Sequence, residues 1–590
     1  MGSLFESLFL KSVNGELGQS MAEALVGYVK GLQQRAASSS SGSSSDDGQL
    51  GGGALARMLV EDGQKVLVIE RGKTDFLTHC LNTSRPHFDH ESQKSPGRDN
   101  ELLYNMLPGK CDLAPSDSSQ SSSEEPDASA CGGKPWYGIG GRSLFWSLES
   151  HEIGENVVKA NSPSEIADSL WGTADQQVGG DDLPGHDGST ITMPSKEGWY
   201  TKAARLLANS PPGDVAYASA KGDITIAEAK LNSAVQKFAQ DQTVAVPQGA
   251  EFADGSRLYY FPQGGYSTAD WLVDHMYKKD KLSKIVCGVE VVSFSLNTKG
   301  DTVEALTLRD INGIHNLPVD AHTKVVLCAG TVNTAAIALR SGKKSKADFQ
   351  KNHKLVGQGL TDHEIWIAKY WKRITRDQIG EQPLELGCNV KVNENPALLT
   401  VCIHAEKFYG HGFSTGEANP ETKESDLVNV LNIMLEFEAP LNESGKVTLS
   451  GSDSASAADR KPLLQIKRKR LDSSQAFEDD LRDIVKSIGT TFGFEGVDQP
   501  QLATWGSVAH EVGTMRMDRP NSSGGLDTGV VDSDLKVHDV KNLYVCDLSV
   551  FPLSPTANPS KTLTALAMRL ADYLRHLEED DDKRVSFKPL

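Results

Sequence analysis

The chain has 590 residues, of which 38% are hydrophobic and 24% are charged, and its net charge is −19. This length suits two interleaved or consecutive domains better than one small domain. The acidic balance argues against a nucleic-acid surface, which needs clustered Lys and Arg, and no apolar run reaches the roughly twenty residues that span a bilayer. The N-terminus lacks the regions of a secretory signal, and the eight cysteines form no C-x-x-C pair. We therefore expect a cytoplasmic protein that binds no nucleic acid and has no membrane span.

The N-terminal region is predicted to be a helix followed by a low-complexity linker. Residues 20–36 place apolar side chains at helical spacing. The Ser/Gly/Asp-rich tract that follows, and a second tract at 116–133, cannot bury a core, so we predict that both are disordered. Residues 1–46 are assigned to this helix and linker.

The segment GGGALARMLVEDGQKVLVIE contains half of a dinucleotide-binding fingerprint. It predicts a glycine turn, a helix over Ala54–Glu61, and a buried strand Val66–Ile69 that ends at Glu70. In the complete motif, glycine backbone N–H groups bind the pyrophosphate at a helix N-terminus and the acid binds a ribose hydroxyl. The pattern therefore nominates Gly52, Gly53 and Glu70 as cofactor contacts. The alternative is an ordinary glycine turn before a surface helix.

The first half of this fingerprint is atypical, because SSSDDGQL stands where an apolar strand is expected. In one register Gly51 starts the motif, but Glu70 then comes about one helical turn too early. In the other, counted back from Glu70, Gly52 is the third glycine and the first two positions fall on Asp47 and Gln49. We prefer the second register because it keeps the helix length. It implies that the first strand and two glycines are missing or replaced.

Farther along the chain, strands and helices alternate. Val289–Leu296 and Val303–Arg309 are predicted to pair, with an Asn-Gly turn at 312–313. VVLCAG (325–330) predicts a buried strand that leads into a helix. From about 373 to 500 the alternating pattern is typical of an antiparallel sheet. This order predicts an α/β domain that is interrupted by a β-rich one.

Several segments resemble the glucose–methanol–choline (GMC) oxidoreductases. HEVGTMRM, followed by VVDSDLKVHDVKNLYVCDLSVFPLSPTANPSKTLTALAMRLADYL, is similar to the C-terminal signature of that family. VVLCAGTVNTAAIALRSG (325–342) and VGQGLTDH (356–363) resemble internal motifs, and GIGGRSLFWS (138–147) resembles the G-G-x-S loop that packs near the flavin. The resemblance covers roughly 50–75, 135–150, 265–372 and 500–580.

The resemblance implies a fold with two interleaved parts. The first is an α/β FAD-binding domain, Rossmann-like and of glutathione-reductase type. The second is an α+β substrate domain built on an antiparallel sheet. The expected FAD-binding parts are 47–160 (with the insert 116–133), 265–372 and 501–590; lid or substrate-domain elements take 161–264, and the substrate-binding domain takes 373–500.

The resemblance also implies an activity, the oxidation of a CH-OH group of a small alcohol or sugar. Hydride would move to flavin N5, and oxygen or another acceptor would reoxidise the flavin. His510 in H-E-V-G-T matches the catalytic histidine of the family, and imidazole suits a base because its unperturbed pKa lies near operating pH. Asn558 in A-N-P-S matches the second catalytic position, where an amide can orient the alcohol and stabilise a developing alkoxide. The alternatives are a satisfied core histidine and turn chemistry at Asn558-Pro559.

Further positions are implied to contact FAD. In a pyranose-oxidase-like branch of the family the G-G-x-S loop carries a flavin-linked histidine; its place here is Phe145, so FAD is expected to be non-covalent. Arg142 is a candidate anion contact or an ordinary surface arginine, and Asp547 is a flavin neighbour, an N-cap, or both. The predicted cofactor contacts are Gly52, Gly53, Glu70, Gly140, Gly141, Ser143, Val291, Asp547, Pro559 and Thr562, and no metal ligand is predicted.

Two other hypotheses stay open. The atypical first strand motivates a catalytically silent relative that keeps the fold but binds FAD poorly. A non-redox lyase on the same scaffold is the other, because fold does not fix function. The substrate and the oligomeric state stay unassigned.

Overall fold

The computed structural model describes residues 48–74, 79, 137–144, 146, 148–173, 176–178, 191–193, 196–207, 221–242, 244–245, 266–277, 282–342, 349–373, 384–403, 427–451, 456–466, 470–494, 499–503, 505–506 and 510–586. The predicted helix at 20–36, the two Ser-rich tracts, Asp47 and Phe145 lie outside these residues. The predictions made for them are therefore untested.

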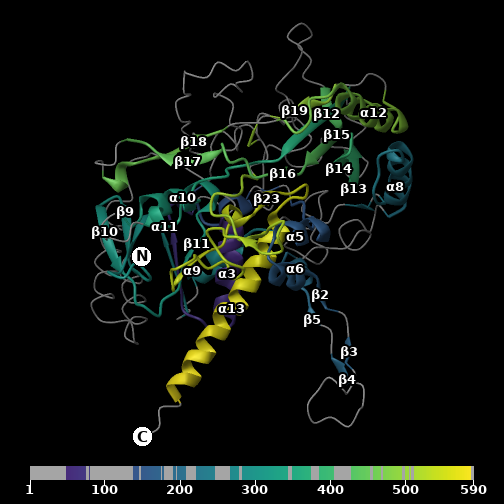
Figure 1. The fold of residues 1–590 in the computed structure, drawn as a ribbon. Coiled ribbons are helices and arrows are strands. Elements are labelled where there is room, and N and C mark those ends of the chain that lie inside the picture. The colour runs from purple at the N-terminus through teal and green to yellow at the C-terminus, as the bar shows by residue number, and fades with distance from the viewer. Residues whose placement is uncertain are drawn as a thin grey trace.

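Two pairs of parallel strands and two long helices form the α/β part of the fold. Strand β1 (Val66–Glu70) pairs with β7 (Ser283–Cys287), and β11 (Val325–Leu327) pairs with β22 (Leu543–Val545). Helix α3 (Gly48–Glu61) packs against the C-terminal helix α13 (Ser560–Ser586), as Figure 1 shows. Apolar residues of both helices and of β11 and β22 share one core. Segments from both ends of the chain thus build one unit.

The two strand pairs correspond to the flanks of a dinucleotide-binding sheet. Such a sheet has the strand order 3-2-1-4-5, and the strand that precedes the first helix lies at its centre. Here β7–β1 matches positions 3-2 and β11–β22 matches positions 4-5; no pairing joins the two among the described strands. The residues that would form the central strand precede Gly48 and lie outside the described part of the chain.

Helix α3 differs from the prediction at its start. The sequence predicts a glycine turn and a helix after it, whereas the helix begins at Gly48 and includes the three consecutive glycines. A Cβ on Gly51 would lie 2.8 Å from the carbonyl oxygen of Cys546, and one on Gly52 would lie 2.8 Å from Cβ of Cys328. Close packing of the helix onto the residues that follow β22 and β11 therefore accounts for these glycines.

Strand β1 is less buried than predicted. The prediction buries Val66–Ile69 on both faces, but Leu67 is 37% exposed and only Glu70 of this strand is buried. On one edge β1 has β7, and no other described strand pairs with it. A parallel strand is normally covered on both faces, so the exposure of Leu67 departs from what the apolar run predicted.

A three-stranded antiparallel sheet confirms the predicted strand pair and extends it. Its strands are β8 (Glu290–Leu296), β9 (Val303–Asp310) and β10 (Gly313–Pro318). The predicted Asn-Gly turn at 312–313 connects β9 to β10. Helix α10 (Gly330–Arg340) follows β11 directly, as the sequence predicts for VVLCAG and the residues after it.

A six-stranded antiparallel sheet forms the second part of the fold, in the order β19-β12-β15-β14-β13-β6. The helices α8 (Lys221–Val235) and α12 (Gln475–Thr491) pack on it and share its core (Figure 1). The predicted sheet is confirmed, but it also takes strands from outside 373–500. The strands are β6 (Val244–Ala245), β12 (Glu364–Arg373), β13 (Leu384–Val392), β14 (Asn395–Ile403), β15 (Leu427–Phe437) and β19 (Gln501–Leu502).

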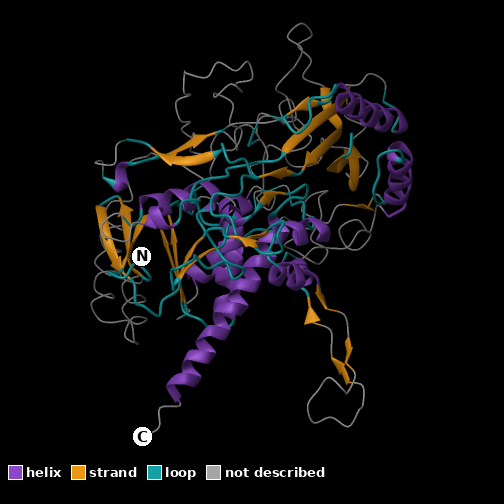
Figure 2. Cartoon of the chain, in the orientation of Figure 1, coloured by secondary structure: helices purple, strands orange, loops and turns teal. Residues whose placement is uncertain are grey.

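Shorter elements connect these parts, and the C-terminal half of α13 extends away from them (Figure 2). No helix among the described residues has the length and apolar character needed to cross a membrane. The remaining elements are η4 (Gly141–Leu144), α5 (Glu155–Asn161), α6 (Ser164–Trp171), β2 (Gly172–Thr173), β3 (Gln176–Val178), β4 (Ile191–Met193), β5 (Lys196–Glu197), α7 (Trp199–Leu206), α9 (Thr268–Tyr277), α11 (Phe349–Asn352), β16 (Ala439–Pro440), β17 (Lys446–Leu449), η9 (Ala457–Asp459), β18 (Pro462–Gln465), β20 (Arg519–Pro520), β21 (Leu526–Asp527), η10 (Leu548–Val550) and β23 (Leu553–Ser554).

Candidate active site

His510 lies beside a second histidine, His363, because two chain segments run antiparallel at this point. Thr361 and Val512 form an isolated antiparallel bridge, with N–H···O distances of 2.8 and 3.2 Å between their backbones. His363 lies two residues after Thr361, and His510 lies two residues before Val512. Since the side-chain period of extended chain is two, the register places the imidazoles opposite each other. His363 was not among the site residues predicted from the sequence, although it stands in the matched motif VGQGLTDH.

The hydrogen bonds of His363 fix the protonation of both rings. Nδ1 of His363 lies 2.8 Å from the carbonyl oxygen of Pro555, and its Nε2 lies 2.8 Å from Nδ1 of His510. A carbonyl oxygen only accepts, so His363 carries its proton on Nδ1 and accepts with Nε2. His510 then donates from Nδ1, which leaves the lone pair of neutral His510 on Nε2. Oriented in this way, His510 has the tautomer of a general base.

Both imidazoles are neutral near pH 7. Burial lowers the pKa of His363 to about 4, against a smaller opposite effect of the Pro555 carbonyl. Burial also lowers the pKa of His510 well below its usual value, and His363 and Arg142 lower it further. A neutral His510 has its lone pair free to take a proton, which is what a base requires.

Asn558 is buried in the loop between β23 and α13, and a carboxylate holds its amide. Its Nδ2 donates to Oε2 of Glu149 at 2.9 Å. Its Oδ1 is buried and has no hydrogen-bond partner among the described residues. The amide therefore presents an acceptor, which suits a donor group of a substrate or cofactor. The role predicted for Asn558, orienting the alcohol and stabilising a developing alkoxide, stays a prediction.

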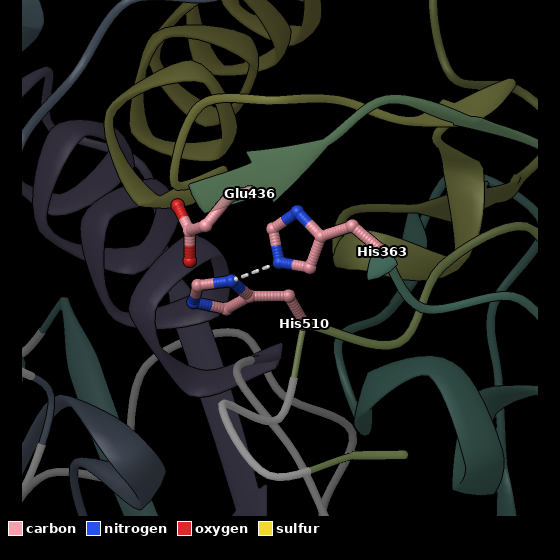
Figure 3. Close-up of side chains that lie close together, drawn as sticks. All are labelled: His363, Glu436 and His510. Atoms are coloured by element: carbon pink, nitrogen blue, oxygen red, sulfur yellow. Dashed lines mark hydrogen bonds between the residues drawn. The ribbon is translucent and has the colours of Figure 1, made fainter. Parts of the chain in front are cut away.

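Buried carboxyl groups surround the two histidines. Glu149, Glu385 and Glu436 are each 1% exposed. Burial raises the pKa of Glu436 well above its usual value, and the nearby acids Glu149, Asp362 and Glu385 raise it further. One oxygen of Glu436 and one ring nitrogen each of His363 and His510 all lie within 4.8 Å of one another (Figure 3). This spacing would also suit a divalent cation, but the 2.8 Å hydrogen bond already satisfies the nitrogens that face each other.

The G-G-x-S loop packs between this cluster and helix α9. Gly140 has a φ of +89°, and a Cβ on it would lie 2.6 Å from Cβ of Ala269, so no other residue fits there. Arg142 is buried and forms an ion pair of 3.2 Å with Glu511, the residue after His510. The surface reading of Arg142 is thus wrong. Gly141 has a φ of +49°, which again favours glycine.

Ser143 of this loop is committed to hydrogen bonds within the protein. Its hydroxyl donates to the carbonyl oxygen of Gly140 at 2.5 Å and accepts from the backbone N–H of Thr268 at 3.1 Å. The loop is therefore fastened to the start of α9. In this position Ser143 shapes the loop, and any contact with a cofactor would come from the backbone.

Asp547 acts as an N-cap, as one of the two readings predicted. Its side chain accepts from the backbone N–H of Ser549 at the start of η10, and its other oxygen accepts from Gly330 N–H at 2.9 Å and from the Thr334 hydroxyl at 2.5 Å. Burial raises the pKa of Asp547 to about 6. The carboxyl ties the starts of α10 and η10 together.

Glu70 ends β1 as predicted, and its carboxyl group is buried. Oε1 accepts from the backbone N–H of Gly72 at 2.5 Å. Burial raises the pKa of Glu70 to about 7, while Gly72 and Arg71 lower it in part. Val291 lies in β8, where it pairs with Leu308. Near the other end of the candidate site, Thr562 Oγ1 is 2.8 Å from the Tyr200 hydroxyl, and the carbonyl of Pro559 accepts from Leu563 N–H at 2.9 Å.

The fold defines a class, an α/β protein with a second part built on an antiparallel sheet. Solved structures that share this fold include the following two. Pyridoxine 4-oxidase from Mesorbium loti superposes with a TM-score of 0.54 and 16% identity, over 90% of this chain and 98% of that one. Formate oxidase superposes with a TM-score of 0.54 and 16% identity, over 90% and 97% of the two chains. At these identities the likeness concerns the fold alone, and it confirms the predicted architecture in outline.

Residues 440–567, which contain His510 and Asn558, match the family of GMC oxidoreductases. Dehydrogenase str4 of Strobilurus tenacellus is 37% identical to this chain over 84 residues. That alignment spans 13% of this chain and 13% of the relative. The family resemblance drawn from the sequence is confirmed.

Proposed function

We propose that this protein is an FAD-dependent oxidoreductase that oxidises a CH-OH group of a small alcohol or sugar, with oxygen or another acceptor taking the electrons. The observation that carries the proposal is the chain from the Pro555 carbonyl through His363 to His510. It leaves a lone pair on Nε2 of neutral His510, as a general base requires. The two family neighbours named as oxidases and the relative named as a dehydrogenase support the same reaction class.

FAD fits the residues at both ends of the candidate site. At one end the buried carboxyl group of Glu70 terminates a parallel strand, where it can bind a ribose hydroxyl. At the other end Oδ1 of Asn558, which has no hydrogen-bond partner in the described part of the chain, can accept from a donor of a cofactor or substrate. We further propose that Gly140, Gly141, Ser143, Val291, Asp547, Pro559 and Thr562 line the non-covalent cofactor between these ends, mainly through backbone contacts.

Each active-site residue has a defined part in the reaction. His510 takes the hydroxyl proton on Nε2: the O–H bond of the alcohol breaks and an N–H bond forms. Asn558, held by Glu149, accepts with Oδ1 from a second donor of the substrate or cofactor, since the hydroxyl proton itself goes to His510. His363 keeps His510 in the base tautomer. Bound FAD would supply the acceptor for the hydride that leaves the carbon.

A second candidate is a relative that keeps the fold but binds FAD weakly. The observation that favours it lies at α3, where the space beside the three glycines is filled by Cys546, Cys328 and Thr268. In this reading Gly52 and Gly53 serve helix packing and do not bind the pyrophosphate. The two candidates differ in the affinity for FAD and share everything else.

Absorbance of the purified full chain separates them. We expect a yellow protein that releases FAD on denaturation and bleaches anaerobically with an alcohol or sugar from a broad panel. Protein that stays colourless after FAD is added would rule out the first candidate and support the second. The variant His510→Ala should keep FAD and lose bleaching, whereas His353→Ala, a buried histidine of the same chain, should bleach like the wild type. Equal bleaching by the His510 variant would remove its assignment as the base.

A further inference from the structure

Two cysteines, Cys328 and Cys546, stand side by side at the ends of the paired strands β11 and β22. The register of this pair ends with Leu327 opposite Val545, so the next residues along the two strands are Cys328 and Cys546. Neighbouring strands lie about 4.8 Å apart, and side chains at paired positions point to the same face of a sheet. The two thiols therefore lie on one face, at the spacing of adjacent strands.

Hydrogen bonds on both sides of the two cysteines keep their backbones at this spacing. The N–H of Cys546 donates to the carbonyl oxygen of Leu327 at 2.9 Å. One residue farther along the chain, the Asp547 carboxyl group accepts from Gly330 N–H, also at 2.9 Å. Disulfides join Cα atoms that lie about 4.4–6.8 Å apart. The backbone around Cys328 and Cys546 therefore already has the separation that a disulfide needs.

The two side chains also interact, and they differ in exposure. Both cysteines are free, and the Cys328 thiol forms a hydrogen bond with the Cys546 thiol. Cys546 is completely buried, whereas Cys328 is half-buried, so a small solute reaches Cys328 first. An accessible thiol beside a second thiol is the arrangement in which the first is oxidised and the second resolves the product.

The other three described cysteines, Cys287, Cys388 and Cys402, have no cysteine as a register partner. The residues opposite them are Glu70 for Cys287, Leu399 for Cys388, and Glu385 and Asn432 for Cys402. Among the described strands, cysteines thus face each other only where β11 and β22 end.

We propose that Cys328 and Cys546 form a reversible disulfide bond when the protein meets hydrogen peroxide. In the first step the Cys328 sulfur attacks one peroxide oxygen: the O–O bond breaks, an S–O bond forms, and water leaves. In the second step the Cys546 sulfur attacks the Cys328 sulfur: the S–S bond forms, the S–O bond breaks, and a second water leaves. The two thiols together lose two electrons and two protons, and the peroxide is reduced to water. The bond would fasten the two strand ends against which α3 packs.

The reaction should be slow at neutral pH. The thiolate is the reactive form, and the hydrogen bond with Cys546 and burial raise the pKa of the Cys328 thiol well above its usual value, with a further contribution from Asp547. The facing turn of α3 contributes Gly51 and Gly52, which do not titrate. Below that pKa, each rise of one pH unit increases the thiolate fraction about tenfold. The bond should therefore form about ten times faster at pH 8 than at pH 7.

Peptide mapping of the full chain tests the proposal. After incubation with excess hydrogen peroxide, the remaining thiols are blocked with N-ethylmaleimide in denaturant and the protein is cut with trypsin. Cleavage after Lys and Arg places Cys328 in the peptide 325–340 and Cys546 in the peptide 542–561, and each of these peptides contains one cysteine. We expect mass spectrometry to find the two peptides joined, with the loss of two hydrogen atoms, and separated again by dithiothreitol.

Matched variants show whether the link is specific. Cys328→Ser and Cys546→Ser should each abolish the rise of the linked peptide with time, whereas Cys287→Ser, which changes a half-buried cysteine of another strand, should keep it. Oxidised wild-type protein whose two peptides stay separate would overturn the proposal, whether Cys328 stays a thiol or ends as a sulfinic acid. A link that forms only in the unfolded chain would overturn it as well. The measurement needs neither bound FAD nor a substrate, so its result is independent of the FAD experiment.

Discussion

Replacing Gly53 by alanine tests whether the three glycines of α3 pack inside a helix or form a phosphate-binding turn. A Cβ on Gly53 would lie 2.4 Å from Cβ and 2.7 Å from Oγ1 of Thr268, the buried first residue of α9. Carbon atoms that are not bonded normally approach to about 3.5 Å. The new Cβ and the Cβ of Thr268 are each bonded directly to backbone, so α3 or α9 must move. Overpacking of this kind destabilises by about 1–3 kcal/mol, while alanine gains about 1 kcal/mol of helix propensity over glycine.

Because the added Cβ would overlap Thr268 deeply, we expect a packing loss of about 3 kcal/mol, the upper end of that range. The gain of about 1 kcal/mol in helix propensity offsets part of it, so Gly53→Ala should lower the free energy of unfolding by about 2 kcal/mol. Urea unfolding followed by tryptophan fluorescence measures the loss as a lower midpoint at constant slope. Gly154→Ala is the control, because its Cβ would meet only Val157, at 3.8 Å. A Gly53→Ala protein as stable as the wild type would refute the helical packing and restore the predicted glycine turn.

Three further predictions concern the site. Glu149→Gln weakens a charge-assisted hydrogen bond to Asn558, so flavin reduction should slow about tenfold at equal FAD content; an unchanged rate would contradict the role of Glu149. The pKa of Glu70 is raised from 4.5 to about 7 in the folded protein, so as the pH rises the unfolded chain releases this proton first. The free energy of unfolding should therefore fall by about 3 kcal/mol between pH 4.5 and 7. Urea titrations at several pH values should show a flatter pH profile for Glu70→Gln. An apolar strand of about five residues placed before Gly48 should raise FAD affinity in fluorescence titrations, whereas a Ser/Gly graft of equal length should not.

The sequence predicted the parts of the fold that follow from local pattern. Alternating apolar residues indicated the antiparallel strands, and the short apolar runs indicated β1 and β11, because a strand pattern is read over a few neighbouring residues. The helix start was wrong for a tertiary reason. Consecutive glycines favour a turn by local propensity, but Gly51 and Gly52 are needed where α3 approaches Cys546 and Cys328, and no local signal encodes that contact.

The candidate site was predicted in part. Motif resemblance identified His510 and Asn558, whereas His363, Glu436 and Glu149 were missed because the chain brings them together over long sequence separations. Two signals were available. An acid in the apolar run LNIMLEFEA was a sign of a buried carboxyl group, and the histidine that ends VGQGLTDH stood inside a matched motif.

Strand β1 has one further consequence, for how its sheet can be completed. A strand edge offers a row of backbone N–H and C=O groups to an extended segment. Among the described strands β1 pairs with β7 alone, and the exposed side chain of Leu67 lies on β1 as well. An extended segment that pairs with this edge would therefore satisfy the backbone groups and cover an apolar side chain at the same time.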